Sequence, residues 1–385
     1  MVSEWPRRPL AEISVNFDTQ RKPVKEAERI AGQYPYYGAS GIVDYVDGYL
    51  FDGEYLLVAE DGENLRTRNT PIAFRATGKF WVNNHAHILQ GNDEASTRYL
   101  NYALLAADIT PYLTGAVMPK LTQGNLNKIE LPCPPPEMQD EIVGVLGTLD
   151  DRIANLRQTN TTLQAIAAAL FKSWFVDFDG VPPEDMQESE LGLIPKEWSV
   201  RSLDSIADYL NGLALQKFPP ESETEFLPVI KIAQLRAGNT EGADKASTRI
   251  KSEYIVEDGD VLFSWSGSLE VEVWTGGRGA LNQHLFKITS REVPKWFYYF
   301  ATRQHLPDFR AIAAGKATTM GHIQRGHLTA AKVAVPPPDA MAKFDAIIAP
   351  LFEQKINNAL QARTLANLRD ALLPRLISGQ LRVSQ

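Results

Sequence analysis

Residues 137–175 read EMQDEIVGVLGTLDDRIANLRQTNTTLQAIAAALFKSWF, and the spacing of their apolar side chains decides the fold class. These side chains recur at alternating steps of three and four residues over four heptads, which predicts a helix that packs against another helix. Asn160 is the polar member of this seam. It either fixes the register of the helix pair or is an exception tolerated near a helix end. The seam positions are Leu146, Leu149, Ile153, Leu156, Asn160, Leu163, Ala167, Leu170 and Trp174.

A second segment, 339–377, carries a looser version of the same seam. Two long amphipathic helices of equal length in one chain predict an intramolecular coiled coil. At ~1.5 Å per residue each helix would extend roughly 58 Å and act as a rigid spacer. The seam includes Phe344, Ile348, Leu351, Leu365, Leu372 and Leu376, and Lys355, Asn358 and Arg369 interrupt it.

The chain also repeats itself at long range, which makes it two large halves rather than an array of short stacked repeats. Three segments return in the same order and at nearly constant offset: a Glu-Trp pair, a Gly-x-Leu followed by three prolines, and a long helical segment. A pseudo-two-fold relation between the halves would make the two helices antiparallel. The matched segments begin at Glu4 and Glu197, at Gly124 and Gly326, and at Thr162 and Thr364.

Each half opens with short β-type runs and Gly/Asp turns, and a run of three prolines then separates this region from the helix. The predicted class is α+β, with two similar α/β domains joined by two antiparallel coiled-coil helices in a pseudo-two-fold internal repeat. The expected divisions are a first globular domain at 1–136, a spacer helix at 137–175, an acidic linker at 176–195, a second globular domain at 196–338 and a second spacer helix at 339–385.

Composition limits the function classes. Hydrophobic residues make up 44% of the 385 residues, which is ordinary for a chain with packed cores. The one cysteine excludes a disulfide scaffold and fits a reducing, cytoplasmic location. We expect no signal peptide and no membrane span. The net charge is −8, but residues 1–195 alone hold 16 basic and 27 acidic side chains, so the remainder is slightly basic and DNA binding is not excluded.

Motifs for catalysis are missing from the sequence. No G-x-G-x-x-G follows a strand, no phosphate-binding P-loop is present, and 134–137 departs from the tetrad of adenine methyltransferases. His85-x-His87 could begin a metal site, but no third ligand stands at short spacing, so we expect no metal. The more economical interpretation is structural hydrogen bonding by Asn83-Asn84-His85, which resembles Asn282-Gln283-His284.

Basic residues mixed with aromatic residues and turns are the candidates for DNA contact, because phosphates require such charges and base edges are read by Arg, Lys, Asn or Gln. Each of them has an ordinary surface charge as its alternative interpretation. The candidates are Arg66, Arg68, Arg75, Lys79 and Lys120 in the first half, and Lys231, Arg236, Lys245, Arg249, Lys251, Arg278, Lys316 and Arg325 in the second.

Five segments together resemble the specificity subunit of type I restriction–modification enzymes, and the resemblance covers the whole chain. The second copy of the first segment departs from it, because 336–341 read PPPDAM and lack the Glu-x-Gln of the first copy. The five segments are PPPEMQ at 134–139, LDDRI at 149–153, LFKSWFVDFD at 170–179, GLIPKEW at 192–198 and LLPRLISGQLRV at 372–383.

The resemblance implies a non-catalytic subunit that recognises double-stranded DNA. Two domains would each read half of a bipartite target, and the helices would set the gap. The helices would also dock two modification (methyltransferase) subunits, which restriction subunits with translocase activity then join. No cofactor is expected in this chain, whereas S-adenosylmethionine, ATP and Mg are expected in the partners. Candidates for partner docking are Asp151, Arg152, Trp174 and Phe175.

Three alternatives remain at this point. The chain could serve a methylation-only system, be a coiled-coil adaptor without DNA reading, or be an enzyme with an unrecognised site. Neighbouring genes would distinguish a methylation-only system from a restriction system. A gel shift with the modification subunit on target and random DNA would distinguish an adaptor from a DNA-reading subunit.

Overall fold

The computed structural model describes residues 5–315 and 321–383. The chain divides into two compact units, and each contains part of both long helices. The first unit holds Met1–Arg152 and Leu365–Gln385, and the second holds Ile153–Thr364. Each unit is therefore assembled from segments that are far apart in the sequence.

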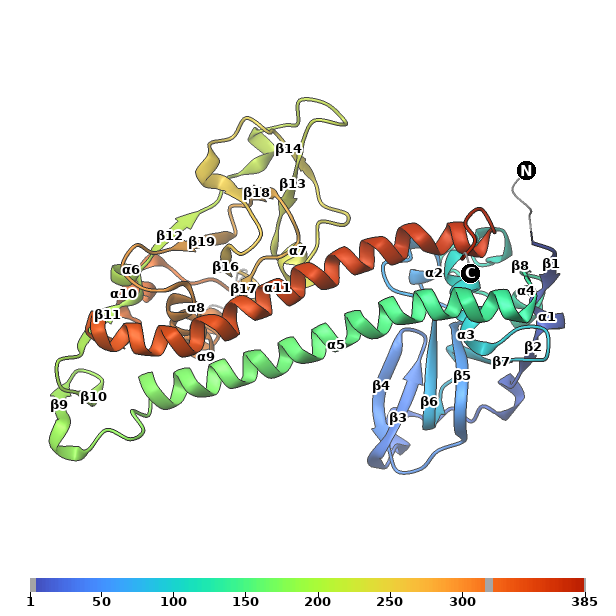
Figure 1. Cartoon of the computed structure of the whole chain (residues 1–385), viewed down its shortest axis with the longest axis horizontal. Coiled ribbons are helices and arrows are strands. Elements are labelled where there is room, and N and C mark those ends of the chain that lie inside the picture. Colours follow the sequence, from blue (N-terminus) through green and yellow to red (C-terminus); the bar gives the residue numbers. More distant parts are fainter. Residues whose placement is uncertain (1–4, 316–320, 384–385) are drawn as a thin grey trace. The chain divides into compact units, whose positions relative to one another are not determined.

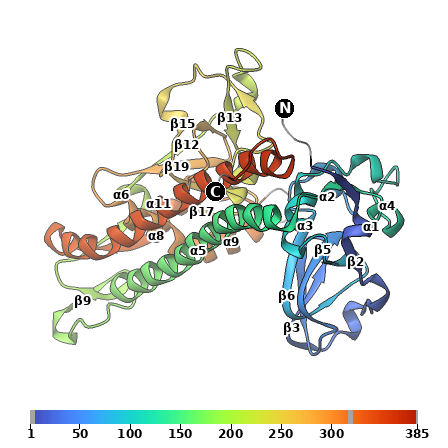
Figure 2. The ribbon, with the colours of Figure 1, turned by 45° about the vertical axis from the view of Figure 1, so that its right-hand side comes forward.

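The first unit is built on a six-stranded sheet in the order β2-β7-β5-β6-β3-β4 (Figures 1 and 2). Neighbouring strands are antiparallel except β3 and β6, which are parallel. The elements are β1 (Arg7–Pro9), α1 (Leu10–Ile13), β2 (Ser14–Asn16), β3 (Ala31–Gly38), β4 (Gly41–Val46), β5 (Phe51–Ala59), α2 (Asn64–Thr67), β6 (Ala73–Val82), β7 (Ala86–Gly91), α3 (Thr97–Ala106), α4 (Gln123–Leu126) and β8 (Glu130–Pro132).

Strand β5 is buried on both faces, which explains its continuous apolar run. Successive side chains of a strand point to opposite faces. Leu56 and Val58 therefore pack in one cluster with residues of α3. Leu57 packs on the other face, with Phe51 and Phe80.

The second unit contains two four-stranded sheets, β12-β19-β16-β17 and β14-β13-β18-β15. The first sheet and the helices α8 and α9 share the large core of this unit. The elements are β9 (Met186–Ser189), β10 (Gly192–Pro195), β11 (Ser199–Ser202), α6 (Leu203–Ile206), β12 (Asp208–Asn211), β13 (Leu227–Ile230), α7 (Ile232–Ala237), β14 (Lys245–Ala246), β15 (Ile255–Val256), β16 (Val261–Ser264), β17 (Val271–Val273), β18 (Gly279–Leu281), β19 (Leu285–Thr289), α8 (Lys295–Gln304), α9 (Leu306–Ala314), α10 (Arg325–Ala330) and β20 (Lys332–Val335).

The predicted internal repeat is confirmed by matching local structures in the two units. Strand β1 pairs with β8 just as β11 pairs with β20, and each pair ends at the prolines that precede a long helix. The one-turn helices α1 and α6 occupy corresponding places. Their apolar residues Leu10, Ile13, Leu203 and Ile206 are all buried.

The two long helices are α5 (Pro136–Phe175) and α11 (Pro338–Ile377), and each has 40 residues. In the second unit, Trp174 near the end of α5 packs on Phe344 near the start of α11, with ring centroids 5.0 Å apart. In the first unit, the side chain of Arg369 in α11 donates to Asp150 in α5 at 2.8 Å. Asp150, early in α5, contacts Arg369, late in α11, and Trp174, late in α5, contacts Phe344, early in α11. The two helices are therefore antiparallel, as predicted.

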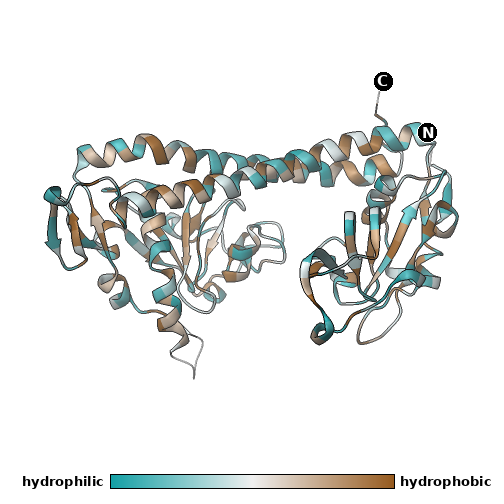
Figure 3. Ribbon diagram, turned by 90° about the horizontal axis from the view of Figure 1, so that it is seen from below, coloured by the Kyte–Doolittle hydropathy of each residue, from teal (hydrophilic) through white to brown (hydrophobic). Residues whose placement is uncertain are grey.

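The apolar surface of the helices is wider than the predicted seam. Phe171 and Phe175 lie one position beyond seam residues, yet both are buried and pack on Phe297 of α8. Phe352 of α11 is buried in the same core. Hydrophobic and hydrophilic segments alternate along both helices in Figure 3. The seam contacts the partner helix as predicted, and the aromatic side chains beside it also complete the core of the second unit.

The segment after α5, expected as an acidic linker, contains the hairpin of β9 and β10. Just before it, the ring of Phe178 packs edge-on against Trp198, with centroids 5.7 Å apart. In the first unit, the segment after α11 likewise contacts the tryptophan of the repeated Glu-Trp pair, because the guanidinium of Arg382 lies 5.2 Å from the ring of Trp5. No helix in the described ranges is both long and apolar enough to cross a bilayer.

Candidate nucleic-acid interface

Acidic side chains pair with most of the basic candidates, so the structure does not present a bare positive face. In the first unit, Arg75 Nη1 lies 2.5 Å from a carboxylate oxygen of Glu54, which Arg98 also contacts. Burial opposes ionisation of Glu54, but the hydrogen bonds from both arginines lower the pKa of its carboxyl. Exposed ion pairs are weak, so phosphate groups can compete for these cations.

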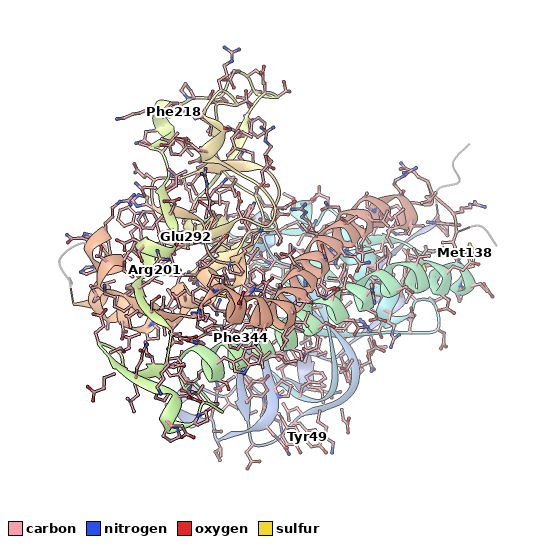
Figure 4. All side chains as sticks on the ribbon, turned by 60° about the vertical axis from the view of Figure 1, so that its left-hand side comes forward. Tyr49, Met138, Arg201, Phe218, Glu292 and Phe344 are labelled. Atoms are coloured by element: carbon pink, nitrogen blue, oxygen red, sulfur yellow. The ribbon has the colours of Figure 1, made fainter. Side chains whose placement is uncertain are left out.

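Lys79 lies on β6, like Arg75, and its ammonium lies 4.6 Å from the ring centroid of Tyr49 (labelled in Figure 4). A hydrogen bond with Tyr49 raises the pKa of the Lys79 ammonium. The Tyr49 side chain is exposed. This pair offers a cation and an aromatic face on the same strand region, which suits contact with phosphates and bases.

Two of the other three candidates of the first unit, Arg66 and Lys120, lie at one loop, 114–120. Arg66 of α2 donates to the Gly115 carbonyl at 2.7 Å. Lys120 lies 3.2 Å from Glu60 and is about half exposed. Arg68 instead donates to two backbone carbonyls at the end of α3, and burial lowers the pKa of its guanidinium. Arg68 therefore closes the end of α3, because the last carbonyls of a helix lack regular intrahelical partners, and among the described residues the Leu104 carbonyl otherwise accepts only a long bond of 3.3 Å from the Ala107 amide.

In the second unit the candidates are distributed over several loops and strands. Lys251 is exposed and has no side-chain partner among the described residues, whereas Arg325 donates to the Tyr209 carbonyl at 3.0 Å. Lys316 lies outside the described residues. The remaining candidates form ion pairs: Lys231 with Asp244, Arg236 with Glu270, Lys245 with Glu223, Arg249 with Glu221 and Arg278 with Glu257.

Glu221 is the most strongly perturbed carboxylate in this set. It accepts hydrogen bonds from the Ser247 hydroxyl and from both the amide and the hydroxyl of Thr248. The bond from Ser247 and the amide bond from Thr248 are the main causes that lower the pKa of Glu221 to about 2. This network ties the loop after Phe218 to the segment that follows β14.

We call residues 60–62 the first anchor, because a loop is attached to them. The amide of Gly62 donates to the Pro119 carbonyl at 3.1 Å, and the amide of Leu121 donates to the Glu60 carbonyl at 2.8 Å. The loop is thus held by backbone bonds to the residues that directly follow β5.

The second unit has the same arrangement at residues 265–267, which we call the second anchor. The amide of Gly267 donates to the Gly321 carbonyl at 2.9 Å, and the amide of Ile323 donates to the Trp265 carbonyl at 3.0 Å. This anchor follows β16 as the first follows β5. The two units therefore share the same pair of anchor hydrogen bonds at equivalent places, although the anchor side chains differ.

A histidine supports each anchor, as the resemblance between the two Asn-containing turns suggested. The Nδ1 atom of His85 lies 2.8 Å from Asp61, and that of His284 lies 3.0 Å from Ser266. His87 has different partners and contacts Asp18 at 2.6 Å through Nδ1. His85 and His87 thus serve separate hydrogen bonds. In the described part of the chain, no three His, Cys, Asp or Glu side chains are grouped to hold a metal ion.

The four partner-docking candidates fall into two pairs. Asp151 and Arg152 are exposed on α5, and their side chains have no polar partner in the described ranges. Trp174 is half-buried against Phe344. Phe175 is 5% exposed and belongs to the core of the second unit, so its side chain has almost no surface for a partner. Burial of this kind serves packing, and a docking role for Phe175 stays a prediction.

The starts of the two long helices differ. Gln139 of α5 is buried, and its side chain donates to the Glu94 and Pro134 carbonyls. Met341 holds the corresponding place in α11 and lines a surface pocket of about 570 Å³, together with Arg201 and Glu292 (labelled in Figure 4). The sequence difference at 336–341, where the Glu-x-Gln of the first copy is missing, therefore coincides with a structural difference: α11 lacks the buried hydrogen bonds that Gln139 makes at the start of α5.

Several polar residues at the helix pair were not recognised as interacting. The sequence pattern marks Asn358 only as an interruption of the seam, but its side chain hydrogen-bonds that of Asn160. Arg363 makes two hydrogen bonds with Asp258, at 2.8 and 2.7 Å. The contact between Asn160 and Asn358 could have been predicted from their positions in the two seams, because polar residues that face each other in a seam form a paired contact.

Comparison with known proteins places these features in a family. The family model described as the type I restriction modification DNA specificity domain matches residues 2–165 and again 195–369. The chain therefore belongs to this family, and the two matches correspond to the two halves of the repeat.

Individual relatives agree with that assignment. The type I restriction enzyme MjaIX specificity subunit of Methanocaldococcus jannaschii is 27% identical over 99% of this chain and 94% of its own length. A putative type I specificity subunit of Haemophilus influenzae is 42% identical over 38% of this chain and 37% of its own length. The crystal structure of the S subunit from M. genitalium matches 97% of this chain and 96% of its own with a TM-score of 0.60. At 15% identity, this last likeness concerns the fold alone.

Proposed function

We propose that this chain is the non-catalytic DNA-recognition subunit of a type I restriction–modification complex. The observation that carries the proposal is the repeated domain with the same pair of anchor hydrogen bonds in each copy. Two copies of one recognition domain in a single chain suit a target made of two half-sites separated by a gap. Recognition then rests on this chain, and methyl transfer and cleavage rest on its partners.

The partners that this function requires are double-stranded DNA, two modification subunits and restriction subunits. The exposed pair Asp151 and Arg152 on α5 is the docking surface we favour for a modification subunit, because neither side chain is engaged by the described residues. S-adenosylmethionine, ATP and Mg would act in the partners. The relative from M. jannaschii, which matches over nearly its whole length, carries the name of a specificity subunit and supports this role.

Exchange of the second domain tests the proposal. Residues 196–338 would be replaced by the corresponding domain of a relative with a different target, and methylated adenines would be mapped in cells that also express the modification subunit. We expect one half of the target to change and the other half to remain. The donor must be chosen to fill the core around Phe171 and Phe175, because these helix residues complete the second unit.

The reciprocal exchange of residues 1–136 is the matched control and should change the other half of the target. If either exchange alters both halves, each domain does not read its own half-site. Unmethylated DNA in the presence of a wild-type chain bound to its modification subunit would contradict the proposed function as a whole.

A further inference from the structure

The loop 114–120 of the first unit is closed at its base. The Thr114 amide donates to the Lys120 carbonyl at 2.8 Å, and the Lys120 amide donates to the Thr114 carbonyl at 2.7 Å. The next residue, Leu121, is tied to the first anchor and also accepts a bond from buried His87 at 2.7 Å. Both ends of the loop are thus fixed to the core of the domain.

The interior of the loop is also restrained. Arg66 donates to the carbonyls of Gly115 and Ala116, at 2.7 and 3.3 Å. Gly115 has a φ of +88°, and a Cβ added there would lie 2.2 Å from the Met118 carbonyl oxygen. Only glycine fits this position, since other residues rarely adopt such a φ and would clash. The loop is therefore ordered before any partner binds.

The tip of this restrained loop is apolar and projects into solvent. Val117 is 94% exposed and Met118 is 64% exposed. Among the described residues, Val117 is the most exposed large apolar side chain. Isolated exposed apolar residues are common on protein surfaces. Two in succession on a backbone held by six hydrogen bonds form a small preorganised apolar surface, which would lose little entropy on binding.

The surroundings of the tip fit nucleic acid. Arg66 and Lys120 stand at the base of the loop and are 39% and 49% exposed. The acidic partner of Arg66, Glu63, is exposed, and a phosphate group can replace this pair at 3.3 Å. The partner of Lys120, Glu60 at 3.2 Å, is only 14% exposed, but it keeps Arg21 at 2.7 Å when the exposed Lys120 ammonium turns to a phosphate. DNA-binding proteins insert apolar side chains, methionine among them, against base steps while basic residues hold the flanking phosphates.

We propose that Val117 and Met118 contact the bases of one half-site of the duplex, with Arg66 and Lys120 on the flanking phosphates. This inference rests on the proposed function. The second unit supports it only through its anchor, because Gly321 and Ile323 bond to residues 265–267 in the pattern by which Pro119 and Leu121 bond to residues 60–62. Residues 316–320 lie outside the described residues.

The test replaces both tip residues in the full chain, as Val117→Ser with Met118→Ser, assembled with its modification subunit. The probe is a duplex that carries the target mapped by adenine methylation, with 2-aminopurine placed at successive positions of each half-site. Wild type should raise the 2-aminopurine fluorescence at one step of one half-site, because an inserted side chain unstacks the base. The double variant should lose that signal and bind the target about 10- to 100-fold more weakly, the scale of one or two base contacts.

Val15→Ser is the matched control, because Val15 is an exposed apolar residue on β2 of the same unit. It should bind and fluoresce like wild type. Unchanged affinity and fluorescence in the double variant would overturn the inference while leaving the proposed function intact. Loss of modification-subunit binding with unchanged base fluorescence would also overturn it, because the tip would then contact protein. If the wild-type complex preferred no duplex over random DNA, the proposed function itself would fail.

Discussion

Asn358 of α11 donates through Nδ2 to the Oδ1 atom of Asn160 in α5 at 3.0 Å, inside the second unit. The pair is embedded in further bonds, because Asn160 also donates to the Lys355 carbonyl at 2.9 Å and Gln354 donates to Asn358 at 2.7 Å. Asn358 is 4% exposed. Of the two interpretations of Asn160, the structure supports the one in which a polar seam residue fixes the register, because only one alignment of the helices joins these amides.

Asn160→Leu should therefore destabilise the protein by about 1–3 kcal/mol, because the buried Asn358 amide loses its acceptor. Adding Asn358→Leu should restore most or all of that stability, since a buried polar pair can be replaced by apolar side chains of similar volume. Urea unfolding measures both. Asn357→Leu is the control, because Asn357 is exposed on the same helix. A single variant as stable as wild type would show that the amide pair has no energetic role.

Gln139→Met copies into the first unit the residue that the second unit has at this place. The variant leaves the Glu94 and Pro134 carbonyls and the Ser96 amide without their buried partner. We expect a loss of about 2 kcal/mol in the free energy of unfolding. Thermal or urea unfolding measures it, with Met138→Leu as the control for a neighbouring, less buried position (labelled in Figure 4). A variant of wild-type stability would mean that water replaces all three bonds.

Charge reversal of Asp151 and Arg152 tests the docking surface. The double variant Asp151→Lys with Arg152→Glu should weaken association with the modification subunit by about tenfold or more, because rearranged charges at an interface oppose binding. Size-exclusion chromatography or calorimetry measures the association, and methylation mapping should show unchanged half-sites. Arg157→Glu, one to two turns further along α5 and also exposed, is the control. Intact assembly with altered half-sites would contradict the assignment.

Insertion of one heptad into each helix tests the proposal that they set the gap between half-sites. The insertion points are between 152 and 153 in α5 and between 364 and 365 in α11, where the two units meet in the sequence. Seam phase is kept, and each helix grows by about 10 Å, close to three base pairs. We expect the same half-sites with a longer gap, or lost binding in a folded protein, because bending or twisting the duplex costs several kcal/mol.

Selection from a library of duplexes with variable gaps would decide between these outcomes. Insertion of the same heptad in α5 alone is the control, because it breaks the pairing of the helices and should unfold the protein. Full activity at the original gap in the double insertion would mean that the helices do not set the spacing.

The hydrogen bonds to Glu221 predict a pH dependence. Its pKa in the folded protein, about 2, lies below the ordinary value of 4.5. The unfolded chain therefore takes up the proton first as the pH falls, and the stabilisation is complete above about pH 4.5 and disappears toward pH 2. Wild type should be more stable than Glu221→Gln at neutral pH, and the difference should shrink between pH 4.5 and 2. Thermal unfolding across this range measures it, and a constant difference would contradict the assignment.

Much of the architecture could be predicted because it depends on local patterns. The three-four spacing of apolar residues predicted both long helices, and the order of repeated segments predicted two related domains. The pattern of one helix cannot say how many surfaces its apolar face contacts. Phe171 and Phe175 lie beside the predicted seam, and only the structure shows that they pack on Phe297 of the second domain.

The candidate interface was less accessible to prediction, for the same reason. Charge alone marks both Arg68 and Lys120 as candidates, but Arg68 closes the end of α3 while Lys120 stands at the base of an exposed loop. Val117 has no charge and belongs to no motif, so its neighbours in the sequence do not indicate a DNA contact.

The sequence by itself determined the helix pair, the internal duplication and the family resemblance, because periodicity and order along the chain are properties of neighbouring residues. Only the tertiary structure decided that Asn358 pairs with Asn160, that Phe175 is core, and that the two anchors make equivalent hydrogen bonds. Such contacts join residues that are far apart in the chain. They form where the folded backbone brings complementary groups within hydrogen-bonding or van der Waals distance, which the sequence does not state.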